Sequence, residues 1–338
     1  DNKAIVAIVF DRINRRCQPL DIFHLLSAWT WSEEFNLQSE FEILKDELKP
    51  YGFHSIGDNI NLLLRIISAI LTGTASAKSL IELNGTEVRN KFNEILNGLK
   101  GSIDFLKSNT KIESLANIPY ENILAPLAVF FSCEGSEQFK YTNEQRKQIM
   151  KWFWKTCFSK RYSAGVLRAL NKDIQDMILL KQNKPSKLGE FDLEIKPDFF
   201  VNNTFSMGSV NTKTFILLLS QSLPRSFVTG SPVSLKDVLK EYNRNEFHHI
   251  YPKAFLAGQK ITNSENCLAN FSFMSKSDNN QLGGVAPSIY KAKMDSNFNE
   301  ILDSCLCKDT GIFEDKYDNF IAKRAQLLAK KANEIINI

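Results

Sequence analysis

Long apolar runs are missing from this sequence of 338 residues. The best candidate for a membrane span, Ile60–Leu71, is short and contains Arg65, whereas a spanning helix needs about 20 apolar residues in succession. A secretory signal pattern is also missing from the first residues. These absences predict a chain that does not span a membrane and that is located in the cytoplasm.

Cysteines are few, and none of them has the spacing of a metal-binding pair. The six are Cys17, Cys133, Cys157, Cys267, Cys305 and Cys307. No Cys-x-x-Cys pair occurs. The cysteines at 305 and 307 have no second cysteine pair elsewhere to complete a four-ligand site, so a structural zinc site is not expected. Scattered thiols are typical of proteins in a reducing cytoplasm.

A starting methionine is absent as well, because the chain begins at Asp1, and this predicts a fragment of a longer protein. Hydrophobic residues make up 43% and charged residues 24% of the chain, which is typical of a soluble globular protein. The length is sufficient for two domains with separate cores. The net charge of +4 is compatible with a polyanionic partner.

Capping residues and helical periodicity predict a mainly α-helical chain. Capping boxes are expected at Ser39 and at Thr142, and a helix that Asp58 opens is expected to end at Gly73. An apolar stripe at helical spacing indicates one long amphipathic helix through Val88, Phe92, Ile95, Leu96, Leu99, Ile103 and Leu106. We divide the chain into a helical region over residues 1–140 and a second region over residues 141–338.

Two of the four histidines are adjacent, in the segment Phe247-His248-His249-Ile250-Tyr251-Pro252. Adjacent side chains on a strand point to opposite faces, so one ring is available to a metal while the other meets a substrate. A loop then precedes the apolar run Asn270-Phe271-Ser272-Phe273-Met274. Ser275 followed by Asp278 fits a capping box, which places Asn279 in the first turn of a short helix. The expected order is strand, loop, strand, helix, with His248, His249 and Asn279 converging.

Each of these residues also has a purely structural interpretation. A pair of histidines on a strand is compatible with one buried, hydrogen-bonded ring and one exposed ring. Asn279 taken alone is typical of a solvated helix start, and Asn280 is the alternative ligand if the register differs by one. Asn266 is interpreted as a loop residue rather than as part of the chemistry. The chemical interpretation therefore depends on the whole set of residues.

With Ile250, Pro252, Asn270 and Asn279 following the histidines, the segment resembles the HNH, or ββα-metal, nuclease motif. That pattern has an acid or a histidine, then His-Ile-x-Pro, an asparagine that closes a loop, and an asparagine or histidine on the next helix. The spacing from Asn270 to Asn279 is similar to that in the HNH domain of CRISPR effector nucleases. The resemblance implies a helical scaffold with a C-terminal ββα-metal module whose core covers residues 244–293.

Other segments resemble GmrSD-type, modification-dependent restriction enzymes. Two of them, similar to parts of the C-terminal nuclease domain, are Pro287-Ser288-Ile289-Tyr290 and Phe320-Ile321-Ala322-Lys323-Arg324. The segment Phe10-Asp11-Arg12-Ile13-Asn14 is similar to a passage late in the N-terminal domain, but that domain's nucleotide motif Asp-Gly-Gln-Gln-Arg is absent. The resemblance implies that residues 1–140 are a remnant of this domain. A missing N-terminal NTPase-like domain or a partner subunit would complete the system.

The resemblance also implies a role for four residues. His249 is the general base, and Asn270 holds the loop and orients the strand of His249. His248 and Asn279 hold one divalent ion, Mg²⁺ or Mn²⁺, with Co²⁺ or Ni²⁺ as alternatives. The implied reaction is hydrolysis of DNA phosphodiester bonds, in the effector of a bacterial antiviral restriction system that cuts foreign or modified DNA.

Basic residues outnumber acidic ones between residues 244 and 293, and we expect Lys253, Lys276 and Lys291 to contact phosphates. A solvated lysine-rich face explains this excess as well. Two other functions stay open. One is a catalytically silent nucleic-acid-binding or sensor module with a degenerate HNH fold. The other is a nuclease directed at RNA, because metal and base do not distinguish the sugar.

Overall fold

The computed structural model of the chain describes residues 35–76, 85–135 and 139–337, together with the single positions 23, 26, 27, 30, 31 and 79. The N-terminal segment at residues 10–14 lies outside the described residues. The described chain is mainly α-helical, and its one sheet has two strands. It forms two compact units that interleave along the sequence. The second unit takes in residues 106–120, 147–161 and 189–338, and the first takes in the remainder.

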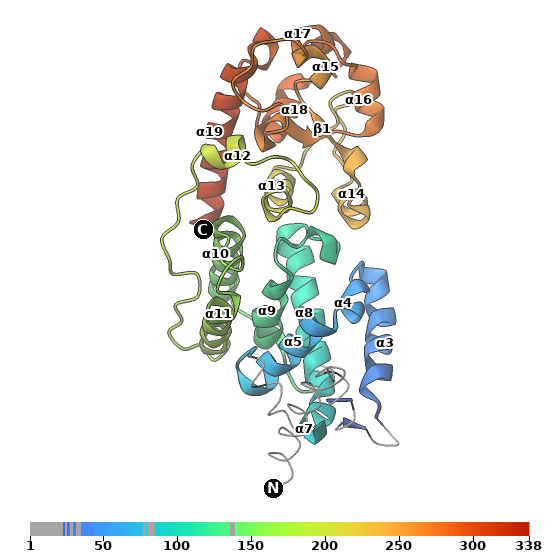
Figure 1. The fold of residues 1–338 in the computed structure, drawn as a ribbon, viewed down its shortest axis with the longest axis vertical. Coiled ribbons are helices and arrows are strands. Elements are labelled where there is room, and N and C mark those ends of the chain that lie inside the picture. Colours follow the sequence, from blue (N-terminus) through green and yellow to red (C-terminus); the bar gives the residue numbers. More distant parts are fainter. Residues whose placement is uncertain are drawn as a thin grey trace, which may run out of the picture. The chain divides into compact units, whose positions relative to one another are not determined.

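The first unit is built from helices only. Its elements, blue to green in Figure 1, are α3 (Leu37–Leu48), η1 (Lys49–Tyr51), α4 (Ser55–Asp58), α5 (Ile60–Thr72), α7 (Gly85–Asn90), most of α8 (Phe92–Thr110), η3 (Glu121–Ile123), α9 (Leu124–Phe131), the start of α10 (Asn143–Ser159) and α11 (Val166–Lys181). Helix α9 is buried along its whole length and packs against α5 and α11. Gly98 and Gly101 let α8 approach α9 closely, because an added Cβ would lie 2.4 Å from the Ala128 carbonyl oxygen and 2.7 Å from Phe131 Cβ.

Helix boundaries match the sequence predictions in part. The capping box at Thr142 is confirmed, because Thr142 Oγ1 accepts from the Gln145 amide at 3.2 Å and Gln145 Oε1 accepts from the Thr142 amide at 2.8 Å. The box at Ser39 is wrong, since Asn36 caps α3 instead. Asn59 caps α5 in place of Asp58, and Gly73 ends that helix in the left-handed region as expected. The long amphipathic helix is interrupted at residue 91, between α7 and α8.

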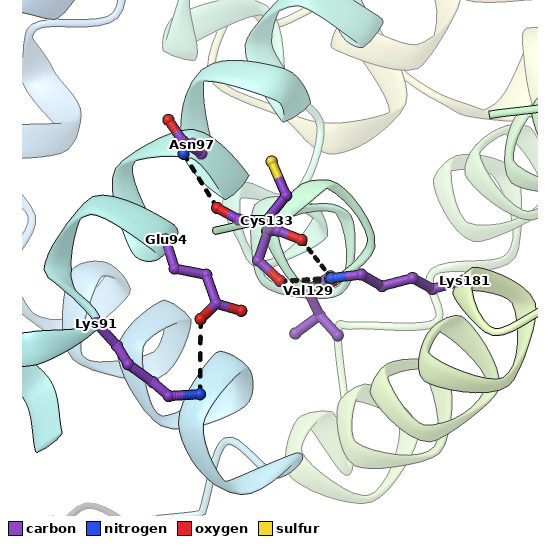
Figure 2. A network of polar contacts seen from close by, with 7 residues as sticks. Lys91, Glu94, Asn97, Val129, Cys133 and Lys181 are labelled. Atoms are coloured by element: carbon purple, nitrogen blue, oxygen red, sulfur yellow. Dashed lines mark hydrogen bonds and ion pairs between the residues drawn. The ribbon is translucent and has the colours of Figure 1, made fainter. Parts of the chain in front are cut away.

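The C-terminus of α9 is closed by side chains from neighbouring helices (Figure 2). Lys181 at the end of α11 donates to the carbonyl oxygens of Val129 and Ser132 and to Ser132 Oγ. Asn97 of α8 donates to the Cys133 carbonyl oxygen at 3.0 Å. Burial lowers the pKa of Lys181. Because all three N–H groups of Lys181 have acceptors, we assign this lysine to helix capping rather than to chemistry.

The second unit contains the sheet. Its later elements, yellow to red in Figure 1, are α12 (Asp198–Asn202), α13 (Val210–Ser220), α14 (Leu235–Glu241), η4 (Arg244–Glu246), β1 (Phe247–His249), α15 (Lys253–Leu256), η5 (Leu268–Asn270), β2 (Phe271–Phe273), α16 (Lys276–Leu282), α17 (Pro287–Tyr290), η6 (Lys291–Lys293), α18 (Phe298–Ser304), η7 (Ile312–Glu314) and α19 (Tyr317–Ile336). The unit also includes η2 (Leu115–Asn117) and most of α10. Its centre is α13, which is buried from Thr214 to Ser220. Gln221, just after α13, donates to the Thr110 carbonyl oxygen at 3.2 Å, so early chain segments pack around this helix.

A buried arginine on α19 supports the sheet. Arg324 has no exposed surface, and one of its terminal nitrogens donates to the carbonyl oxygens of Ala269 and Phe271 at 2.7 and 2.8 Å. The other donates to the Cys305 carbonyl oxygen at 3.0 Å. One guanidinium therefore ties η5, β2 and the end of α18 to α19, with carbonyl groups as its acceptors.

In the described part of the chain, no helix combines the length and the apolar character that crossing a bilayer requires. Four of the described cysteines are buried and Cys133 is half-buried, and all five are free thiols. Cys17 lies outside the described residues.

We expect Arg324→Ala to destabilise the chain by roughly 3–5 kcal/mol, because it removes three charge-assisted hydrogen bonds and leaves buried carbonyl groups without donors. The control is Lys323→Ala, a neighbouring exposed position on the same helix, which should change stability by less than about 0.5 kcal/mol. Urea unfolding followed by circular dichroism measures both. Equal stability of the two variants would contradict the supporting role of Arg324.

Candidate functional site

The two strands pair antiparallel over three residues each, with Phe247 opposite Phe273, His248 opposite Ser272 and His249 opposite Phe271. The ladder continues beyond the strands, because the Ile250 amide donates to the Asn270 carbonyl oxygen at 2.8 Å. Phe247, Phe271 and Phe273 are buried, whereas both histidines are half-buried. The alternation of a strand puts His249 on the face of the phenylalanines and His248 on the opposite face.

The His249 ring is held on two sides. The Phe271 ring lies against it with a centroid separation of 4.2 Å, and Nε2 of His249 lies 3.2 Å from Oδ1 of Asn266. Burial lowers the pKa of His249 to about 4, although the bond to Asn266 acts in the opposite direction. The imidazole is therefore neutral near pH 7 and has one nitrogen free to accept a proton.

The His248 ring has a different partner. Its Nε2 lies 3.0 Å from the carbonyl oxygen of Asn245. Because a carbonyl oxygen only accepts, Nε2 carries the hydrogen and Nδ1 keeps its lone pair. Burial lowers the pKa of His248, which also favours the neutral ring. A neutral imidazole whose second nitrogen donates to a carbonyl group is the usual arrangement of a metal-binding histidine.

Asn270 closes the loop between the strands through its buried amide group. Its Oδ1 accepts from the Tyr251 amide at 2.9 Å, and its Nδ2 donates to the carbonyl oxygens of Tyr251 at 3.2 Å and Glu265 at 2.8 Å. Asn270 has no exposed surface. These bonds join the two ends of the loop immediately beside His249.

The loop is also anchored to the start of α19. Both carboxylate oxygens of Asp318 accept from the Thr262 amide, and Oδ1 accepts from the Asn263 amide at 2.9 Å. These bonds lower the pKa of Asp318 in spite of its partial burial. Tyr317 donates its hydroxyl to the Ser264 carbonyl oxygen at 2.7 Å. The loop therefore has one defined conformation on the side that faces α19.

Helix α16 begins where the sequence predicts. Oγ of Ser275 accepts from the Asp278 amide at 3.0 Å. The Asp278 carboxylate turns away from the cap and accepts from the Ser226 hydroxyl at 2.7 Å and the Phe227 amide at 3.2 Å. Asn279 follows in the first turn and is half-buried, whereas Asn280 is exposed. Within residues 139–337, no hydrogen bond joins the Asn279 side chain to either histidine.

Arg244 is a neighbour of the histidines that the sequence motif does not include. Its guanidinium lies over the rings of Phe205 and Phe271 at 5.1 and 5.0 Å, and it donates to the Phe247 carbonyl oxygen. Phe271 therefore contacts both the His249 ring and the Arg244 guanidinium. Burial lowers the pKa of Arg244. Position alone could have suggested it, because Arg244 lies three residues before the first residue of the strand of the histidines.

The three lysines expected to bind phosphate have different surroundings. Lys276 is exposed at the start of α16. Lys253 pairs with Glu265 at 3.6 Å. Lys291 lies over the rings of Phe298 and Phe313 at 4.6 and 4.7 Å. Their contact with nucleic acid stays a prediction, and Lys276 is the one of the three whose ammonium is not engaged by a described ion pair or ring.

Among the described residues, no group of three or more histidine, cysteine, aspartate or glutamate side chains is arranged to hold a metal ion. The candidate ligands, His248 and Asn279, are one imidazole and one amide. Such a pair fits a divalent ion only weakly, because both groups are neutral and the remaining positions must come from water or substrate oxygens.

Comparison with known proteins gives one informative match. No protein-family model matches the chain. The chain is 21% identical over 380 aligned positions to the uncharacterized protein MJ0686 of Methanocaldococcus jannaschii, an alignment that covers all of this chain and 63% of that protein. The chain thus spans less than two thirds of the length of this relative. The name of this relative states no activity.

We expect both Asn270→Ala and Asn270→Asp to destabilise the chain by roughly 2–4 kcal/mol. Alanine leaves the Tyr251 amide and two carbonyl groups unpaired. Aspartate keeps the acceptor but places a charge against two carbonyl oxygens, so it should be no better than alanine. Urea unfolding measures these changes, with the exposed Asn280→Ala as the control. Wild-type stability of Asn270→Asp would show that the amide donors contribute nothing.

Proposed function

We propose that the chain carries a metal-dependent endonuclease site of the HNH, or ββα-metal, type and hydrolyses phosphodiester bonds in DNA. One observation carries the proposal. Strand β1 with its two histidines, a loop closed by Asn270, strand β2 and a helix with Asn279 in its first turn follow each other in that order. A histidine pair with only a structural role does not require this loop closure or this helix.

His249 is the general base in this proposal. Its ring is neutral near pH 7, and its position between Phe271 and Asn266 restricts its rotation. A neutral, oriented imidazole takes a proton from an attacking water without first losing one of its own. The Arg244 guanidinium lies over the ring of Phe271, the residue that also contacts His249. We assign this guanidinium to binding the phosphate that is cut, since its geometry matches that of a phosphate group.

His248 and Asn279 are the proposed ligands of one divalent ion. Nδ1 of His248 has the free lone pair for this role, because Nε2 is bonded to Asn245. A bound ion supplies Lewis-acid stabilisation of the charge on the phosphate and on the leaving oxygen. With two neutral protein ligands, the site depends on phosphate oxygens of the substrate, so metal and DNA should bind cooperatively.

The biological setting follows from the resemblance to modification-dependent restriction enzymes. We propose that the full protein is the effector of a bacterial defence system in the cytoplasm that cuts foreign or modified DNA. A further N-terminal NTPase-like domain or a partner subunit would control it. The 63% coverage of the archaeal relative is compatible with a longer protein. Lys253, Lys276 and Lys291 are proposed phosphate contacts that position the duplex.

The central test is nicking of supercoiled plasmid by the purified chain with a divalent metal. His249→Ala should lower the cleavage rate by roughly 10²–10⁴-fold, because proton transfer is lost. Its affinity for DNA and its folding should stay near wild type, since His249 makes no proposed phosphate contact. A cleavage rate close to that of the wild type would remove His249 from the mechanism. An RNA substrate of the same length, tested in parallel, separates the two kinds of nuclease.

A second prediction concerns the choice of metal. Many HNH sites have an acid at the position of His248, and imidazole nitrogen favours softer first-row ions than carboxylate oxygen does. Cleavage with Mn²⁺, Co²⁺ or Ni²⁺ should therefore exceed cleavage with Mg²⁺ at equal concentration. His248→Asp should stay active and shift the preference toward Mg²⁺, while His248→Ala should be nearly inactive.

The initial nicking rate across a metal series measures this preference, and two asparagine variants serve as a matched pair. Asn279→Ala should lose activity and regain part of it at higher metal concentration, whereas the adjacent Asn280→Ala should cleave as the wild type does. A wild type that prefers Mg²⁺, or an active His248→Ala, would show that His248 is not a ligand. A sensitive Asn280 would shift the helix ligand by one residue.

A further inference from the structure

Asn266 is a loop residue whose side chain contacts the His249 ring, although its sequence context indicates only a loop. Its Oδ1 lies 3.2 Å from Nε2 of His249. The two residues are distant in the sequence, and the antiparallel pairing of β1 with β2 brings the end of the loop beside His249. This contact is the one hydrogen bond that the described residues give to the His249 ring.

The backbone of Asn266 is fixed on both sides. Its amide donates to Ser264 Oγ at 3.2 Å, and its carbonyl oxygen accepts from the Phe205 amide at 2.8 Å. The next residue, Cys267, forms a β-bridge with Thr204. The Phe205 ring stacks on Phe271 with a centroid separation of 4.1 Å. The segment that fixes the Asn266 backbone thus also supports the ring beneath His249.

The residues before Asn266 are held as well. Thr262 and Asn263 bond to Asp318, and the Ser264 carbonyl oxygen accepts from Tyr317. The Glu265 carbonyl oxygen accepts from Asn270. A loop whose only task was to connect two strands would not need a bond at each position from 262 to 266. The bonds along it end at the residue that contacts His249.

We infer that Asn266 is the positioning residue of His249. Its amide oxygen accepts the hydrogen on Nε2 and so selects the neutral tautomer in which Nδ1 is the basic nitrogen. The hydrogen bond sets the rotation of the ring about its Cβ–Cγ bond, and Phe271 sets its tilt. This inference rests on the proposed function, because it names the atom of His249 that takes the proton from water.

The orientation of the amide group can be tested directly, because a flipped amide predicts the opposite result. With Oδ1 facing Nε2, the ring carries its hydrogen on Nε2. With Nδ2 facing it, the hydrogen would lie on Nδ1. An aspartate carboxylate at this position can only accept a hydrogen bond. Asn266→Asp therefore leaves the tautomer unchanged if the wild-type ring carries its hydrogen on Nε2, and would reverse it if the wild-type hydrogen lies on Nδ1.

The experiment is two-bond ¹H–¹⁵N correlation of the histidine rings in the metal-free protein near pH 8, where neutral imidazole dominates. The chain has four histidines, and the His249→Gln spectrum identifies the His249 signals. Wild type and Asn266→Asp should both show hydrogen on Nε2. Asn266→Ala should show a mixture of tautomers. The matched control is Asn263→Ala, which removes a bond from the same loop to Asp318 and should leave the His249 signals unchanged.

Cleavage gives the second measurement. Asn266→Ala should lower kcat by roughly 10–100-fold with little change in KM, as is typical when a residue that orients a reacting group is lost. Asn266→Asp should recover most of that loss, and Asn263→Ala should keep the wild-type kcat.

The spectra test the role of Asn266, and the cleavage rates test the proposed function, so either claim can be overturned without the other. A wild-type spectrum with hydrogen on Nδ1 overturns the assigned tautomer, and a single unchanged tautomer in Asn266→Ala overturns the positioning role of Asn266, whatever the activity. The wild-type spectrum decides the tautomer even if Asn266→Ala does not fold. An active His249→Ala would overturn the proposed function, while the tautomer result would still show whether Asn266 orients the ring.

Discussion

The hydrogen bonds of the Asn270 amide are the constraint on which the candidate site depends. Both strands are only three residues long, and an isolated two-stranded hairpin of that size is marginally stable in water. The Asn270 side chain adds bonds to Tyr251 and Glu265 at the two ends of the loop. The Asn270 side chain therefore adds to the ladder in fixing the end of β1, and with it the position of both histidines.

Helix α19 provides the support from outside the sheet. Asp318 and Tyr317 in its first turn hold the loop, and Arg324 two turns later holds the backbone of β2. Buried charges are costly unless they are paired or fully hydrogen-bonded. The terminal nitrogens of Arg324 donate to carbonyl groups of three segments, whereas its Nε has no hydrogen-bond partner, so the cost of its burial is offset in part, and only when all three segments are in place. Folding of the sheet is thus coupled to docking of the last long helix.

Local signals in the sequence predicted the local parts of the structure. The caps at Thr142 and Ser275 depend on residues three positions apart, and both formed. Asn59 displaced Asp58 as a cap because several polar residues at a helix start can all accept from a backbone amide. The contact of Asn266 with His249 depends on strand register and on a loop whose course is set by α19. A contact of this kind leaves no periodic pattern in the sequence, so the sequence alone predicts Asn266 to be a simple loop residue. The same holds for the placement of Arg244 over Phe205 and Phe271.

The interleaved course of the chain has a consequence for how this protein could arise or be re-engineered. The unit with the sheet draws on residues 106–120 and 147–161 as well as on everything after residue 188. Recombination at a single point, natural or in the laboratory, would therefore either split that unit or carry residues 121–146 and 162–188 of the first unit with it. The histidine-bearing segment cannot be exchanged as a cassette. Its inheritance is tied to that of the first unit. Homologous replacement would have to preserve every point at which the chain passes from one unit to the other.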